Sequence, residues 1–526
     1  MQIHTFIKYM IRVSMILIMP AMILACATQE DNAITNIQGG TVKVGIPMWF
    51  DHISPTKENS TSYSAWGPGI AYSRILRQGN VINLDTTYQS TQIICDICKK
   101  WEMKSSTEFN FLIKDDVKWS NLTLSNYEEY LSAYDIEFSL QKNVQPKSAD
   151  SHTLHMIKNV VANSDVDLTI SLNYPDSDFL MAMANGKNKI IKKDHIYEDS
   201  NITSLVSSGA WTLEEYIPDT STRMAKSLSS ENIPYLNSIE FIHIPDDEAR
   251  YSAYMVGLTD IYSLDDSENT FGEIEPNLYY HHSGLGVEMI INTEVSPFDN
   301  TELRQALMYS VNPNQIIEEA WSGKGYFSLG FPVSDANWLP NSIWQQYFNN
   351  LPKSRDILSS SGIPLPIPIE ITSSDYGDSY TKSIDIISKS LKKVGFEPTI
   401  RMLNRREYAT NSWTTGNFQI NIGPTFPQSS TNGYLLPVLH TNGKWNTSNH
   451  KNEYLDNLLL KQSHEYSHPE RTKLIESINL EVLNNAYRFM PVTKIEAWDW
   501  KENIKNFNPI LRNDEYYHWA QISITP

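Results

Sequence analysis

The chain has 526 residues, which allows roughly two to four domains at about 150 residues each. Acidic residues outnumber basic ones by 61 to 42, and the formal net charge of −19 argues against a nucleic-acid-binding protein, which needs a basic surface. Hydrophobic residues make up 40% of the chain, enough for sizeable globular cores.

Residues 1–26 have the pattern of an export signal. Lys8 and Arg12 form a positive end ahead of the apolar stretch Val13–Leu24, which is too short to span a bilayer comfortably. The stretch leads into Cys26, in a context similar to a bacterial lipobox. We therefore expect Cys26 to become the lipidated first residue of a membrane-anchored, extracytoplasmic protein. An uncleaved anchor or an ordinary signal peptide is the alternative.

Residues 27–40 are polar and lack periodicity, so they predict a tether. Thr41–Phe50 then alternates between polar and apolar residues and ends in aromatic side chains, which is typical of a strand whose end opens on a cleft. Cys95 and Cys98 follow in a CxxC pattern. In an exported protein this pair predicts a disulfide, and a redox or metal role is the weaker alternative because no second CxxC pair accompanies it.

Several later segments predict an alternation of strands and helices. Val287–Ile291 is an apolar run of the length of a buried strand, and Asp299 precedes a helical pattern that it can cap. Asn312 followed by a proline indicates the start of another helix. After them, Ile367–Thr372, Lys382–Val394 and Phe396–Met402 predict a strand, a helix and a strand.

These segments carry phrases that resemble the family 5 extracellular solute-binding proteins, the receptor subunits of ABC importers for peptides, nickel chelates and related solutes. Residues 292–307 contain N-T-x-x-x-P-F-D-x-x-x-x-R-Q-A-L. Similar phrases lie at Phe109–Trp119, Ala133–Leu140 and 234–261, in the family's order. The resemblance implies an α/β fold of the periplasmic-binding-protein type II class, in which two lobes are joined by a two-strand hinge and a small extra domain is inserted in lobe I.

The resemblance also implies the domain boundaries. We expect lobe I to comprise residues 41–62, 195–285 and 492–526, the inserted extra domain residues 63–194, and lobe II residues 286–491. The two hinge crossings are then expected near Gly286 and Pro491.

The implied function is the capture of a small solute, peptide-like or a metal chelate, between the lobes, followed by delivery to an ABC permease. No nucleophile elbow, HExxH, P-loop or dinucleotide motif is present in the sequence, so we expect no enzyme, no cofactor and no metal site. We also expect a monomer that binds no nucleic acid. A sensor or interaction lipoprotein on the same fold is the alternative, followed by a cell-envelope hydrolase.

Five aromatic residues are the candidates for the lining of the solute site. They are Trp49 from lobe I and Trp413, Phe426, Tyr434 and Trp445 from lobe II. In peptide-binding members of the family, an aspartate in the segment that corresponds to residues 418–428 receives the peptide's α-ammonium group. Here Pro427 stands at that position, and no Asp or Glu occurs between Glu407 and Glu453. A proline offers neither a charge nor an N–H group, so it cannot pair with a buried ammonium, which argues against ordinary peptide recognition.

Overall fold

A computed structural model describes residues 39–58, 60–84, 88–120, 129–145, 154–199, 201–202, 205–227, 233–264, 279–327, 345–425, 430–507 and 517–525. The predicted signal segment with Cys26, most of the tether, Phe426 and Pro427 lie outside the described residues.

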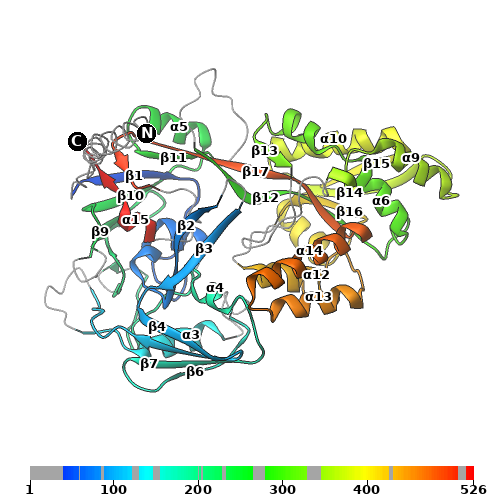
Figure 1. Ribbon diagram of the computed structural model, residues 1–526. Coiled ribbons are helices and arrows are strands. Elements are labelled where there is room, and N and C mark those ends of the chain that lie inside the picture. Colours follow the sequence, from blue (N-terminus) through cyan, green and yellow to red (C-terminus); the bar gives the residue numbers. More distant parts are fainter. Residues whose placement is uncertain are drawn as a thin grey trace, which may run out of the picture.

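The largest element is an eleven-stranded mixed sheet that runs through both halves of the molecule (Figure 1). Its order is β15-β14-β16-β12-β17-β11-β1-β10-β9-β8, with β13 also paired to β17. Two long strands, β12 (Tyr279–Ile291) and β17 (Arg488–Trp500), occupy its centre and pair with each other in antiparallel fashion. They connect the two halves, and Gly286 and Pro491 both lie within them.

The half that corresponds to lobe I is built on parallel strands. The strands β1, β10 and β11 are Thr41–Ile46, Ser238–His243 and Ile261–Leu264, and β1 pairs in parallel with both others. β9 (Ser221–Lys226) and β8 (Trp211–Ile217) extend the sheet in antiparallel fashion. Helix α5 (Asp247–Met255) begins where the Asp246 side chain accepts a hydrogen bond from Ala249 N.

Short elements complete this half. They are α2 (Thr61–Trp66), the 3₁₀ helix η1 (Pro68–Ala71), β18 (Ile504–Lys505), α15 (Tyr517–Gln521) and β19 (Ser523–Ile524). Trp211, Trp498 and Trp519 are buried in the core beneath them.

The half that corresponds to lobe II repeats the parallel arrangement. The strand β14 (Ile367–Ser374) pairs in parallel with β15 (Phe396–Leu403) and β16 (Ile420–Pro424). Helix α10 (Asp378–Val394) buries Ile384, Ile387 and Leu391 at helical spacing and ends at a glycine, Gly395, with φ of 121°.

Further elements of this half are α6 (Thr301–Ser310), α7 (Pro313–Gln315), the π-helices η3 (Ile316–Ala320) and η5 (Tyr408–Trp413), β13 (Gly325–Phe327), η4 (Gln345–Tyr347), α9 (Leu351–Ser360), α11 (Arg405–Glu407), α12 (Thr431–Leu439), α13 (Glu453–Ser463) and α14 (His468–Asn485). The cap of α6 differs from the expected one. Asn300, not Asp299, accepts the hydrogen bond from Glu302 N, because the helix begins one residue later.

A separate four-stranded antiparallel sheet lies within the segment expected to form the inserted domain. Its order is β4 (Cys98–Ser105), β5 (Glu108–Ile113), β7 (Asp167–Leu172) and β6 (Ile157–Ala162). The helices α3 (Ala133–Asn143) and α4 (Phe179–Met183) and the hairpin of β2 (Leu76–Leu84) and β3 (Tyr88–Cys95) belong to the same segment.

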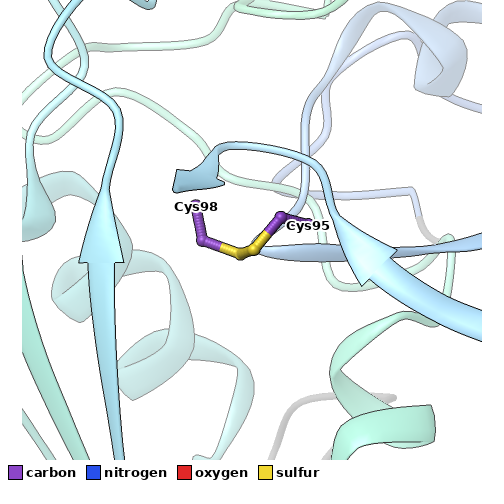
Figure 2. The surroundings of a disulfide bond; sticks show 2 residues. All are labelled: Cys95 and Cys98. Atoms are coloured by element: carbon purple, nitrogen blue, oxygen red, sulfur yellow. A yellow bond between two sulfur atoms is a disulfide. The ribbon is translucent and has the colours of Figure 1, made fainter. Parts of the chain in front are cut away.

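The disulfide expected from the sequence joins Cys95 at the end of β3 to Cys98 at the start of β4 (Figure 2). The Cα atoms of the two cysteines are 5.1 Å apart. The bond therefore ties the hairpin to the four-stranded sheet within the segment expected to form the inserted domain.

Candidate functional site

Gly286, in the crossing strand β12, is hydrogen-bonded to lobe II. The backbone N–H of Gly286 donates to Thr425 Oγ1 at 2.8 Å, and its carbonyl oxygen accepts from Thr425 N at 3.0 Å and from the Tyr380 hydroxyl at 3.4 Å. The pairing of β12 with β17 shifts register between His282 and Gly286. Gly286 therefore links the crossing to two elements of lobe II.

The carboxyl ends of the parallel strands in both halves point toward this crossing. In lobe II, the last residue of β16, Pro424, lies opposite Val287 in β12, whereas its first residue lies opposite Ile291. In lobe I, the first residue of β11 pairs with Trp500, at the end of β17 that is farthest from lobe II. Its last residue pairs with Ala497, which lies nearer to the crossing. Ligands of open α/β sheets bind outside the carboxyl ends of the strands, so this edge is the candidate solute site.

In lobe I this edge carries stacked aromatic rings. Trp49, on the loop after β1, stacks on Phe50 at 4.5 Å between ring centroids and on His243, the last residue of β10, at 5.2 Å. Tyr216 lies parallel to Trp49 at 6.3 Å, and burial raises the pKa of its phenol. The indole of Trp49 is half-buried in this stack. The stack gives lobe I a rigid aromatic surface at this edge.

In lobe II the same edge carries tyrosines and an arginine that the sequence analysis did not single out. The guanidinium of Arg405 lies over the Tyr376 ring at 5.3 Å and donates from Nε to Asp375 O at 2.9 Å. Tyr376 in turn contacts Tyr408 edge-on at 5.6 Å. Asp375 and Arg405 follow the ends of β14 and β15, and their position after two predicted strands is the signal that identifies them.

Tyr434, one of the five candidates, lies inside lobe II and is 1% exposed. Its hydroxyl donates to Glu288 Oε1 at 2.8 Å, and the same oxygen accepts from Arg488 Nε at 2.9 Å. Burial, reinforced by the negative charge of Glu288, raises the pKa of Tyr434 well above its ordinary value. In this arrangement Tyr434 fixes a buried ion pair, and its role in solute binding stays a prediction.

Trp413 and Trp445 are brought together, with ring centroids 6.4 Å apart. They lie near the start of β16, where Asn292 Nδ2 donates to Gly416 O at 2.8 Å, and not at its carboxyl end beside Gly286. Trp445 also packs against the core of α12, α13 and α14. Their predicted part in the lining remains a prediction, and among the described candidates only Trp49 lies at the carboxyl edge.

Among the described residues, no group of three or more His, Cys, Asp and Glu side chains is placed to hold a metal ion. The same residues include no helix that is both long and apolar enough to cross a membrane.

Comparison with solved structures agrees with this architecture. HbpA2 of Haemophilus parasuis superposes with a TM-score of 0.78 at 17% identity, covering 93% of this chain and 100% of that one. DppA of Helicobacter pylori, in complex with the peptide STSA, gives a TM-score of 0.71 at 18% identity and covers 93% and 99%. The chain thus has the type II periplasmic-binding-protein fold, as the sequence predicts.

Curated relatives match over part of their length. Heme-binding protein A of Haemophilus influenzae is 24% identical over 52% of this chain and 55% of its own length. The dipeptide-binding protein of Escherichia coli is 23% identical over 61% and 65%, and the nickel-binding periplasmic protein of the same organism is 24% identical over 58% and 62%. The match therefore spans between about half and two thirds of these relatives.

A family model, described as bacterial extracellular solute-binding proteins, family 5 middle, matches residues 92–447. This range includes the inserted sheet, β12 and the parallel strands of lobe II. The chain belongs to the family 5 bacterial extracellular solute-binding proteins.

Proposed function

We propose that this chain is the receptor of an ABC importer, anchored to the membrane through Cys26, which captures a peptide-like solute or a metal chelate between its lobes and delivers it to the permease. The convergence of the strand ends of both halves at the β12–β17 crossing is the observation that carries the proposal. A solute in this position contacts both lobes, so its binding favours the closed arrangement.

The residues at the edge limit how a peptide could be held. Trp49 offers an aromatic surface and Arg405 a cation for a carboxylate, but the segment between Glu407 and Glu453 offers no acid for an α-ammonium group. The relatives bind solutes as different as dipeptides, nickel, heme and glutathione, according to their names. The solute panel of a binding test therefore has to include all of these.

Thermal unfolding of the ligand-free protein with dipeptides, glutathione, a nickel–histidine chelate and heme tests the capture. A solute at 100 times its Kd adds about 2.7 kcal/mol to the free energy of unfolding, which is a measurable rise in Tm. The Trp49→Ala variant is expected to lose that rise, whereas Trp101→Ala, which removes an exposed tryptophan from the inserted sheet, is expected to keep it. No rise with any member of the panel counts against capture.

The anchor is tested separately. Labelled palmitate is expected to enter the wild-type chain and to be absent from Cys26→Ser, which is expected to leave the membrane fraction. A Cys26→Ser chain that stays with the membrane to the same extent contradicts the anchor and leaves solute capture untouched.

A further inference from the structure

A second connection between the halves lies apart from the crossing strands. Residues 176–178, between β7 and α4 of the inserted domain, contact the start of α12, the end of α13 and the start of α14 in lobe II. Figure 1 shows α4 beside α12 and α13. The segments in contact are about 250 to 290 residues apart in the sequence, as the bonds of Asn432 and Tyr466 show.

A buried ion pair forms the centre of this contact. Arg471 Nη1 of α14 lies 2.5 Å from Asp178 Oδ1, and the side chains are 12% and 2% exposed. The other oxygen of Asp178 accepts from Asn432 N, at the start of α12, at 2.5 Å. Both charges are thus largely removed from water and face each other across the contact, while Arg471 also donates to Gln462 Oε1 and Asn432 Oδ1 of its own lobe, both at 3.2 Å.

Further hydrogen bonds surround the ion pair. Ser177 N donates to Ser463 O at 2.8 Å, and the Ser177 hydroxyl donates to the same oxygen at 3.0 Å. The hydroxyl of Tyr466 donates to Ser106 O, in the turn between β4 and β5, at 2.9 Å. These polar atoms therefore have hydrogen-bond partners on the other side of the contact. If the domains separated, water would have to replace those partners.

The inserted domain itself is fixed to lobe I. Ser120 and Ser207 exchange two backbone hydrogen bonds, at 2.7 and 3.1 Å. The hydroxyl groups of Ser73 and Ser208 are also hydrogen-bonded to each other. Because the inserted domain is held to lobe I in this way, a rotation of lobe II about the β12–β17 crossing has to break the contact centred on Asp178 and Arg471.

We propose that Asp178, Arg471 and the hydrogen bonds of Ser177 and Tyr466 form an inter-lobe latch, through which the inserted domain stabilises the closed arrangement of the two lobes. The latch rests on the lobe movement of the proposed function, and it assigns the inserted domain a part in closure. It sets how often the lobes open without solute, and thereby the apparent affinity for any solute that binds the closed form.

Hydrogen exchange of the full mature chain, without added solute, tests the latch. The amides of Ser177 and Asn432 donate across the contact, so they report its opening directly. Arg471→Met keeps an unbranched stem of similar bulk near the backbone and removes the charge, and we expect both amides to exchange at least tenfold faster than in the wild type. Tyr466→Phe, a mild change at a partly exposed position, is expected to change exchange in the same direction by a smaller factor.

A matched control lies on the same helix. Lys473 pairs with Glu470 at 2.8 Å, and their side chains are 67% and 58% exposed, so Lys473→Met removes a cation from α14 without touching the inserted domain. Exchange at Ser177 and Asn432 is expected to stay at the wild-type rate in this variant. Amides of β1 and β10 serve as the check that Arg471→Met is folded.

Small-angle scattering separates lobe opening from local loss of structure. Arg471→Met is expected to have a larger radius of gyration than Lys473→Met, since breaking the latch lets lobe II rotate. Exchange rates and scattering that are the same in the two variants overturn the latch. The latch experiments use no solute, so their outcome does not depend on the thermal unfolding panel. If no solute in the panel raises Tm, solute capture is refuted and the latch is not.

Discussion

Gly286 packs against the backbone of Val492 so closely that a Cβ atom on residue 286 would overlap the Val492 carbonyl oxygen. The obstacle is backbone and not a flexible side chain, so it cannot move aside without separating β12 from β17 at the crossing. We expect Gly286→Ala to lower the free energy of unfolding by about 3 kcal/mol, as overpacking in a core does. Urea unfolding measures this change.

The control for Gly286 is a glycine that has space around it. Gly257 has a φ of +77° and no atom within 4 Å of a built Cβ, so Gly257→Ala meets only backbone strain, about 1 kcal/mol. If Gly286→Ala and Gly257→Ala lose the same free energy of unfolding, the close approach to Val492 is not the reason that residue 286 has to be glycine.

Local signals in the sequence identified several elements correctly. Asn312 caps α7 with Pro313 in its first turn, and α10 ends at Val394 as predicted, because caps and stops depend on residues within one turn of the helix. Asn300 replaced Asp299 as the cap of α6, since both side chains can accept and only the helix register decides between them.

Contacts between distant segments could not be predicted in the same way. β12 extends from Ile291 back to Tyr279, well before the apolar run at Val287, because pairing with β17 and not hydrophobicity continues the strand. The partners of Glu288 and Asp178 lie about 200 and 290 residues away, and neither pair has a sequence signal. The three described aromatic candidates of lobe II lie away from the carboxyl edge, Tyr434 in the core and Trp413 beside Trp445, because the residue type alone does not say which face of the lobe a ring lies on.

The ion pair of Glu288 and Arg488 predicts a strong effect on stability. Arg488 Nη2 lies 2.8 Å from Glu288 Oε1, and their side chains are 1% and 6% exposed. Arg488→Met leaves the carboxylate buried without its cation, so we expect a loss of about 3 to 5 kcal/mol in urea unfolding. The double variant Glu288→Leu with Arg488→Met is expected to recover most of this loss, because no charge then remains buried.

An exposed pair provides the comparison for Arg488. The side chains of Lys389 and Asp385 are 66% and 58% exposed, so Lys389→Met is expected to change stability by less than about 0.5 kcal/mol.

If the double variant of Glu288 and Arg488 is as unstable as Arg488→Met alone, the loss of stability comes from packing and not from the unpaired charge.

The disulfide predicts a modest and local effect. Cys95 and Cys98 close a ring of only a few residues, for which the loss of chain entropy amounts to about 2 kcal/mol. Cys95→Ser with Cys98→Ser is expected to destabilise the inserted domain by this amount, and reduction of the wild type is expected to give the same shift in Tm. If Tm falls in the double variant but not when the wild type is reduced, the serine side chains and not the loss of the disulfide cause the change.

Asp176, which adjoins the latch, predicts a pH dependence of the free energy of unfolding. Its Oδ1 accepts from Asn432 Nδ2 at 2.7 Å, while Oδ2 is buried without a hydrogen-bond partner. Burial, and then the negative charge of Asp178, raise the pKa of Asp176 to about 6, whereas Asn432 and His155 act in the opposite direction. The other titratable or charged groups that face this cluster are Tyr174, Tyr466 and Arg471.

The raised pKa means that the closed, folded state binds more protons than the unfolded state between about pH 4 and 6. The contribution of Asp176 is therefore most favourable below about pH 4 and is lost as the pH rises through 6, by about 3 kcal/mol. Asp176→Asn removes this dependence, so we expect the variant to gain on the wild type between pH 4 and pH 7 in urea unfolding. A stability difference that is equal at the two pH values contradicts the assignment.

His450 predicts the opposite dependence. Burial lowers its pKa to about 4, and the neutral ring donates from Nε2 to Leu439 O at 2.7 Å while Nδ1 accepts from the Ser448 hydroxyl at 2.8 Å. The unfolded chain takes up the proton near pH 6.5, so the contribution of His450 is complete above that pH and about 3 kcal/mol is lost as the pH falls to 4. We expect His450→Gln, followed by urea unfolding at pH 7 and pH 4, to lose less stability on acidification than the wild type. An equal loss in both proteins would show that folding does not lower the pKa of His450.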